Sequence, residues 1–144
     1  MTEIAFHFNL PDKTAYLCRL LRKAVAHGAR VAVSGDQLLM TELDKALWSF
    51  SATDFVPHCL ASSDSVIVDA SPVVLGVDAS AAPHHDVLLN LAEDVPAGFE
   101  RFNRVIEVVG DGVQDRSMSR RRWKHYEDRG YSIVRHDLAR KGAD

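Results

Sequence analysis

The chain has 144 residues, which is enough for one domain with a substantial hydrophobic core. Apolar residues make up 47% and charged residues 26%, as in ordinary soluble proteins, and no apolar run approaches the roughly 20 residues of a membrane span. The formal net charge is −3, and the N-terminus has an early Glu3 and no basic region, so we expect neither a membrane anchor nor a secretory signal. Two distant cysteines, Cys18 and Cys59, form no CxxC motif and favour buried thiols in a reducing cytoplasm.

The first half of the chain alternates between strand-like and helix-like patterns. Apolar residues recur at every second position in the strand-like segments and at helical spacing in the others. An aspartate precedes each helix-like segment as the expected N-cap. The expected elements are a strand over Glu3–Asn9, a helix over 12–27 with Asp12 as cap and Gly28 as stop, a strand over Arg30–Val33, and a helix from Asp36 to Trp48.

The second half is less regular where it begins. Thr53–Leu60 contains Pro57, which lacks a backbone N–H, and we expect this segment to be irregular. Two β-branched runs, Val66–Val68 and Val73–Val77, predict a hairpin or two separate strands. The elements expected next are a strand over Asp86–Leu91, a short helix over Pro96–Phe102, a strand over Arg104–Val109, a basic helix over about 114–128 between Gly112 and Gly130, and a strand over Tyr131–Arg135.

This order of elements predicts an α/β fold. We expect a single three-layer domain over residues 1–138, with a mostly parallel central sheet flanked by helices in a nucleotide-binding-like topology, and a frayed tail over residues 139–144. The sequence has no GxGxxG or GxxxxGK[ST] motif to cradle a phosphate. The cluster His84–Asp86 and the adjacent pair His58–Cys59 do not have the spacing of a metal site or a nucleophile with its base. We therefore expect no cofactor, no metal and no catalytic activity.

The predicted helix at 114–128 carries the most informative pattern. Arg116, Arg120 and Lys124 recur at every fourth position and share a helical face, with Trp123 beside Arg120. From Asp64 to Asp115 there are ten carboxylates and two basic residues, whereas from Arg116 onward there are nine basic residues and four acidic ones. Such a face is often merely solvated, but guanidinium groups also bind phosphates and carboxylates bidentately. The pattern leaves two ligand classes open, nucleic-acid phosphate and an acidic peptide with a free C-terminal carboxylate.

Three blocks of sequence match the pattern of a known family in the same order. The first is LDKALWSFSATDFVPHCLA at 43–61, with Leu-Asp-x-x-Leu-Trp followed by Phe-x-Pro-His. The second is DVLLNLAEDVPAGFERFNRVIEVVGDG at 86–112, and the third is RSMSRRRWKHYEDRGYSIVRHDL at 116–138. Residues 62–85 lie between these blocks and match poorly. Together the blocks resemble the chi subunit of bacterial DNA polymerase III, an accessory protein of the clamp loader.

The resemblance implies a non-catalytic adaptor in the bacterial replisome, cytoplasmic and associated with the nucleoid. Chi proteins link the clamp loader, through the psi subunit, to the acidic C-terminal tail of single-stranded DNA-binding protein, which ends in Pro-Phe. The resemblance also implies that this protein contacts DNA mainly indirectly. The alternative left open by the residues is a direct single-stranded nucleic-acid binder that uses the basic helix.

The resemblance assigns two binding faces. The residues implied in tail binding are Arg116, Arg120, Trp123 and Lys124. The residues implied in binding psi, or a repair helicase on the same face, are Trp48, Phe55, Val56, Pro57 and His58. Large apolar residues are mostly buried, so core packing is the competing interpretation of Trp48 and Phe55. His58 is expected to serve as a structural hydrogen-bonding group.

Overall fold

The structure is a computed structural model that describes residues 1–50 and 55–139. Within these residues one sheet is formed by β1 (Glu3–Leu10), β2 (Val31–Ser34), β3 (His58–Leu60), β4 (Val73–Gly76), β5 (Val87–Asn90), β6 (Arg104–Gly110) and β7 (Ile133–Asp137). The helices are α1 (Lys13–Ala26), α2 (Gln37–Ser49), α3 (Ser65–Ala70) and α4 (Val113–Asp128), with short 3₁₀ turns η1 (Ala79–Ala81) and η2 (Phe99–Arg101).

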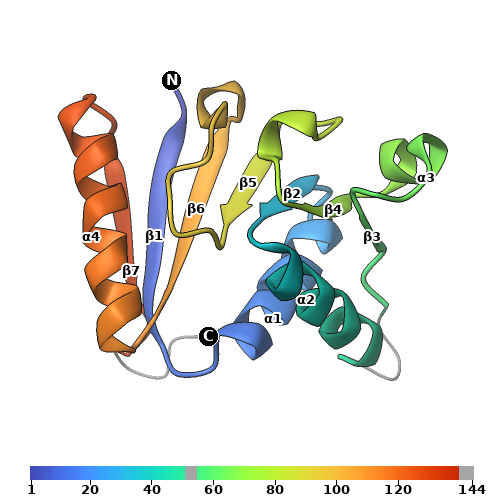
Figure 1. Cartoon of the computed structure of the whole chain (residues 1–144), viewed down its shortest axis with the longest axis horizontal. Coiled ribbons are helices and arrows are strands. Elements are labelled where there is room, and N and C mark those ends of the chain that lie inside the picture. Colours follow the sequence, from blue (N-terminus) through green and yellow to red (C-terminus); the bar gives the residue numbers. More distant parts are fainter. Residues whose placement is uncertain (51–54, 140–144) are drawn as a thin grey trace.

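The strands follow the order β3-β4-β2-β5-β6-β1-β7, and each neighbouring pair is parallel. From β1 the chain passes through α1 to β2 and through α2 to β3, at one edge of the sheet (Figure 1). It then returns past β4, through η1 to β5, through η2 to β6 and through α4 to β7, at the other edge. Because parallel crossovers are right-handed, the two directions of travel place their connections on opposite faces. The expected α/β fold with a parallel central sheet is confirmed.

Each face of the sheet has its own apolar core. On one face, α1 and α2 bury residues such as Leu21 and Leu47 against β1, β2 and β6. On the other face, Tyr126 of α4 and Phe99 of η2 pack against Ile4 and Val105. Strands buried on both faces are apolar at nearly every position, which is why the β2 and β5 segments read as short continuous apolar runs.

The helix boundaries follow their local signals. Asp12 Oδ1 accepts a hydrogen bond from the Ala15 N–H at 3.0 Å, and Asp36 Oδ1 accepts one from the Leu39 N–H at 2.8 Å, which confirms both predicted N-caps. Gly130 has a φ of +82° just after α4, a conformation in which a side chain would be strained.

Two predictions in the middle of the chain are wrong. Val66–Val68 lies in the helix α3, none of whose residues is buried, because the crossover from β3 to the parallel strand β4 has to leave the sheet. The irregular segment expected over Thr53–Leu60 instead contains β3, which is too short to show a period and is fixed by pairing with β4. Residues 53 and 54 lie outside the described residues, as do residues 140–144 of the expected tail.

Candidate functional site

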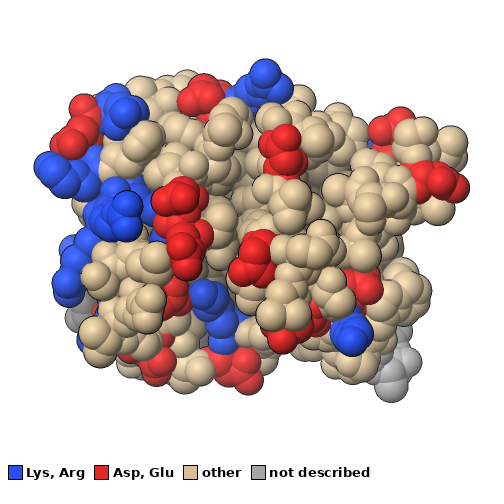
Figure 2. All heavy atoms as spheres, in the orientation of Figure 1, with Lys and Arg blue, Asp and Glu red and all other residues tan. Residues whose placement is uncertain are grey.

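The basic residues of α4 do not all face solvent. Arg116, Arg120 and Arg121 are exposed, and Figure 2 shows Lys and Arg side chains gathered over the α4 end of the molecule. Arg122 is only 4% exposed and points toward the sheet. Arg122 is one of the nine basic residues from Arg116 onward, but its charge is paired inside the protein.

A buried polar network holds α4 against the sheet. Glu107 of β6 is fully buried, and its carboxylate accepts hydrogen bonds from Arg122 Nε at 2.8 Å and from the Tyr126 hydroxyl at 2.7 Å. The Asn90 amide donates to the same carboxylate at 3.0 Å. Burial raises the pKa of the Glu107 carboxyl, and the nearby Arg122 guanidinium offsets part of that rise. A fully buried carboxylate needs these donors, so the network fixes the position of α4.

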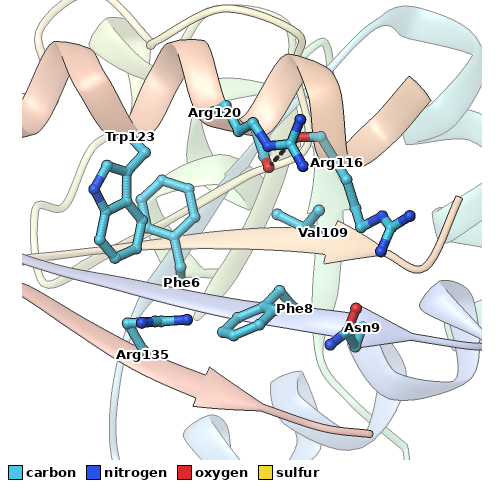
Figure 3. A pocket seen from close by; sticks show the side chains of 9 residues that line it. Phe6, Phe8, Asn9, Val109, Arg116, Arg120, Trp123 and Arg135 are labelled. Carbon is cyan, nitrogen blue, oxygen red and sulfur yellow. Dashed lines mark hydrogen bonds between the residues drawn. The ribbon is translucent and has the colours of Figure 1, made fainter. Parts of the chain in front are cut away.

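A cavity of about 470 Å³ lies beside this anchored helix. It opens between α4 and the strands β1, β6 and β7 (Figure 3). Among the described residues, its lining combines aromatic rings with guanidinium groups and contains no carboxylate. The lining residues, named here together as the α4 groove, are Phe6, Phe8, Asn9, Val109, Arg116, Ser119, Arg120, Trp123 and Arg135.

Aromatic rings form the inner surface of the α4 groove. The centroids of Phe6 and Trp123 are 5.0 Å apart. The Arg135 guanidinium carbon lies 5.5 Å from the Phe8 centroid and 5.8 Å from the Trp123 centroid. These distances allow cation–π attraction, which holds the planar guanidinium against both rings. The groove therefore offers an apolar surface next to fixed positive charge.

The structure brings together three of the four predicted tail-binding residues. Arg116, Arg120 and Trp123 line the α4 groove, but Lys124 does not. Successive helical residues turn by about 100°, so Trp123 is rotated only about 20° from Arg116 whereas Lys124 is rotated about 80° away. Lys124 instead lies 3.3 Å from the Asp128 carboxylate, one turn along the helix.

The acidic residue that precedes Arg116 on α4 is engaged elsewhere. Asp115 accepts hydrogen bonds from Lys13 Nζ at 2.8 Å and from the Gly110 N–H at 2.7 Å. Burial alone would raise the pKa of Asp115, but these two hydrogen bonds and the Lys13 charge lower it overall. Asp115 is thereby paired with α1, which leaves the guanidinium groups of the groove available for a ligand.

Sequence reasoning missed Arg135, Asn9 and the phenylalanines of β1 as groove residues. Asn9 has a φ of 64° at an irregularity of the β1–β6 register, and its amide donates to Asp137 Oδ1 at 2.9 Å. One signal for Arg135 was present, because every second residue of a strand shares a face. The apolar Ile133 packs into the core on that face, so Arg135 points to the same side.

The second predicted face lies at the other end of the sheet, on α2 and β3, far from α4 in the strand order (Figure 1). Trp48 is 62% exposed and Phe55 is 53% exposed, with ring centroids 4.9 Å apart. Core packing is therefore the wrong interpretation of these two rings. Pro57 is also exposed. Exposed aromatic pairs of this kind are uncommon on protein surfaces that bind no partner.

Two residues assigned to this second face are inside the protein. Val56 is only 1% exposed and belongs to the core, so its assignment as a contact residue is corrected: alternation along the chain turns it inward between Phe55 and Pro57. His58 is buried, with Nδ1 2.6 Å from the Val56 carbonyl oxygen and Nε2 3.1 Å from Asp44 Oδ1. Its ring also contacts those of Trp48 and Phe55, at 5.3 and 5.7 Å between centroids, so His58 supports the exposed pair from below.

The chain matches the family model described as "DNA polymerase III chi subunit, HolC" over residues 1–134. It belongs to the DNA polymerase III chi subunit family. The chi-family chain is 36% identical over 145 residues to "DNA polymerase III subunit chi" of Pseudomonas aeruginosa, with 97% of this chain and 99% of that protein aligned. It is 23% identical over 117 residues to the protein of the same name from Haemophilus influenzae, with 81% of each chain aligned. The match covers α4 and the aromatic pair, and it ends one residue before Arg135.

In the part of the chi-family chain that the structure describes, no three His, Cys, Asp or Glu side chains converge on a position where a metal ion could bind. His84 is buried, and burial lowers the pKa of its imidazole. None of the described helices combines the length and apolar character required to cross a bilayer. Among the described residues, the α4 groove and the Trp48–Phe55 pair are the candidate binding surfaces.

Proposed function

We propose that this chi-family protein is a non-catalytic adaptor of the DNA polymerase III holoenzyme, and that its α4 groove binds the acidic C-terminal tail of single-stranded DNA-binding protein. The observation that carries the proposal is the groove itself. Arg116, Arg120 and Arg135 surround an aromatic surface built on Phe8 and Trp123. A peptide that ends in phenylalanine presents the complementary groups, a carboxylate beside an aromatic ring, and acidic residues upstream.

The energetics favour modest, salt-sensitive binding. Burying one phenylalanine ring contributes about 1.5–3 kcal/mol. The exposed guanidinium groups add charge-assisted hydrogen bonds, which weaken as salt screens them. A DNA strand coated with single-stranded DNA-binding protein carries many tails, so avidity compensates for a weak single contact. DNA is then contacted mainly through that protein.

The Trp48–Phe55 pair fits the second partner of an adaptor. We assign it to the psi subunit or clamp loader, or to a repair helicase that uses the same face. Its position on α2 and the segment just before β3, at the far end of the strand order from α4, permits both partners to bind at once. A bridging protein needs this separation, because two partners on one face would compete.

The test uses fluorescence anisotropy with a labelled acidic peptide ending in Pro-Phe, as the free acid and as the C-terminal amide. We expect the amide to bind at least about tenfold more weakly, because a hydrogen bond to a charged group is worth about 1.5–3 kcal/mol. Equal binding of acid and amide would refute a carboxylate site.

A second measurement separates the adaptor from a direct DNA binder. Oligonucleotide coated with single-stranded DNA-binding protein should recruit the chi-family protein, whereas a coat that lacks the acidic tail should not. Bare oligonucleotide should bind weakly at physiological salt. Tight binding to bare DNA that Trp123→Ala removes would favour base stacking in the groove instead.

A further inference from the structure

We infer that Arg135, and not Lys124, supplies the third cation of the α4 groove and selects an aromatic residue at the ligand's C-terminus. This inference rests on the proposed function of the groove. Arg135 lies on β7, beyond the residues that the family model matches. It takes the role that the helical pattern in the sequence assigns to Lys124.

Arg135 lies on a different wall of the groove from the two arginines of α4. Arg116 and Arg120 both project from α4, so they line one wall of the groove. Arg135 projects from β7 and lies on the opposite side, below Trp123 and beside Phe8 in Figure 3. Cations on two walls can contact a carboxylate from both sides. A third cation on α4 could only extend the charge along one side.

The guanidinium of Arg135 is more available to a ligand than the ammonium of Lys124. Among the described residues, no carboxylate lies within ion-pair distance of Arg135, whereas Lys124 lies 3.3 Å from Asp128. A ligand that recruits Lys124 must break this pair and turn the side chain toward a groove that it does not line. Arg135 needs no such movement.

The Arg135 guanidinium is held in place by two aromatic rings. It lies between 5 and 6 Å from two ring centroids, at 5.5 Å from Phe8 and 5.8 Å from Trp123. A planar cation held in this way is already ordered before the ligand arrives, so less conformational freedom is lost on binding. Its flat face is also a surface on which an aromatic ring of the ligand stacks, and an aliphatic side chain gains less there. Lysine would keep the charge but lose this surface.

The test compares Arg135→Ala, Arg135→Lys and Lys124→Ala with the wild-type protein, with Arg121→Ala as the control for an exposed arginine outside the groove. The probes are acidic peptides of one sequence ending in Phe, in Leu, or in amidated Phe. We expect Arg135→Ala to weaken binding of the Phe peptide at least about tenfold, as for loss of a charged hydrogen bond. Arg135→Lys should retain part of the affinity and lose most of the preference for Phe over Leu. Lys124→Ala and Arg121→Ala should each change binding less than about threefold, as for surface charges at a rim.

The outcomes separate this inference from the proposed function. If the wild-type protein prefers the free acid but Arg135→Ala binds like wild type, or Lys124→Ala is the more damaging change, Arg135 is not the third cation and only the inference fails. If the wild-type protein binds no free-acid peptide, both fail. Should Arg135→Ala lower the thermal midpoint, Arg135→Gln, which keeps most of the aliphatic stem and removes the charge, replaces it in the comparison.

Discussion

Replacing Arg122 by alanine should destabilise the protein by about 3–5 kcal/mol at about pH 7, the range for removing one partner of a buried ion pair. The substitution removes the 2.8 Å contact to Glu107 and the 3.0 Å hydrogen bond from Arg122 Nη1 to the Glu93 carbonyl. Glu107 remains fully buried with only the Tyr126 hydroxyl and the Asn90 amide as donors. The charged carboxylate is then poorly compensated.

The ability of Glu107 to take up a proton limits this loss. An ordinary glutamate has a pKa of about 4.3, so holding it protonated in the folded state at about pH 7 costs about 3.7 kcal/mol and at about pH 5 only about 1 kcal/mol. In the variant the pKa of Glu107 rises further above its unfolded value, so the folded state binds more protons than the unfolded state. The stability of the variant relative to wild type therefore falls as pH rises, and part of the loss is recovered in acid.

The assay is urea unfolding followed by tryptophan fluorescence, at about pH 7 and about pH 5. Arg121→Ala is the matched control, because Arg121 is the neighbouring exposed arginine, and its effect should stay within about 0.5 kcal/mol. We expect the effect of Arg122→Ala to shrink by about 2 kcal/mol or more between the two pH values. An effect as small as that of the control, or one that does not change with pH, would refute a charged buried pair.

Three further outcomes follow from burial. Trp48→Ala should lower the unfolding free energy by less than about 1 kcal/mol, because the ring is 62% exposed. The variant should lose clamp-loader association in a pull-down and keep peptide binding. Loss of both activities in a folded variant would indicate one shared site. Burial, with His136 and Arg104 nearby, lowers the pKa of His7 to about 4, so stability should fall as pH drops from about 6.5 to about 4. His7→Asn should flatten that part of a plot of thermal midpoint against pH, and an unchanged slope would contradict the assignment. Cys18 is 2% exposed and burial raises the pKa of its thiol, so a thiol reagent should label it at a rate that follows unfolding in urea, not at the rate of a free thiol.

Periodicity and capping residues predicted those elements whose causes are local. Asp12 and Asp36 predicted where their helices begin, because each cap bonds to a residue only three positions away. The strand β3 and the helix α3 were mispredicted because their states depend on the pairing with β4 and on the crossover that pairing requires. Short segments of this kind carry too few residues for a period to be seen.

The candidate site shows the same division between local and distant causes. The face shared by Arg116, Arg120 and Trp123 is a property of one helix, so spacing predicted it. Arg135 enters the groove only because β7 pairs with β1, which brings it next to Phe8. Spacing along α4 did not predict that Arg122 is buried, because its partner, Glu107, is fifteen residues away on a strand. A carboxylate within the otherwise apolar run VIEVV was a sign that some cation would be needed inside.

The place of β1 in the sheet has a consequence for synthesis of the protein. This first strand is hydrogen-bonded to β6 and β7, so no sheet neighbour exists for it until the last part of the chain leaves the ribosome. About 100 residues separate Leu10 from Gly110 at the end of β6, which corresponds to roughly 5–20 s of translation at about 5–20 residues per second. During that interval Phe6 and Phe8 are open to chaperones. The α4 groove combines these rings with side chains from α4 and β7, so an unfinished or truncated chain has no groove with which to compete for acidic peptides.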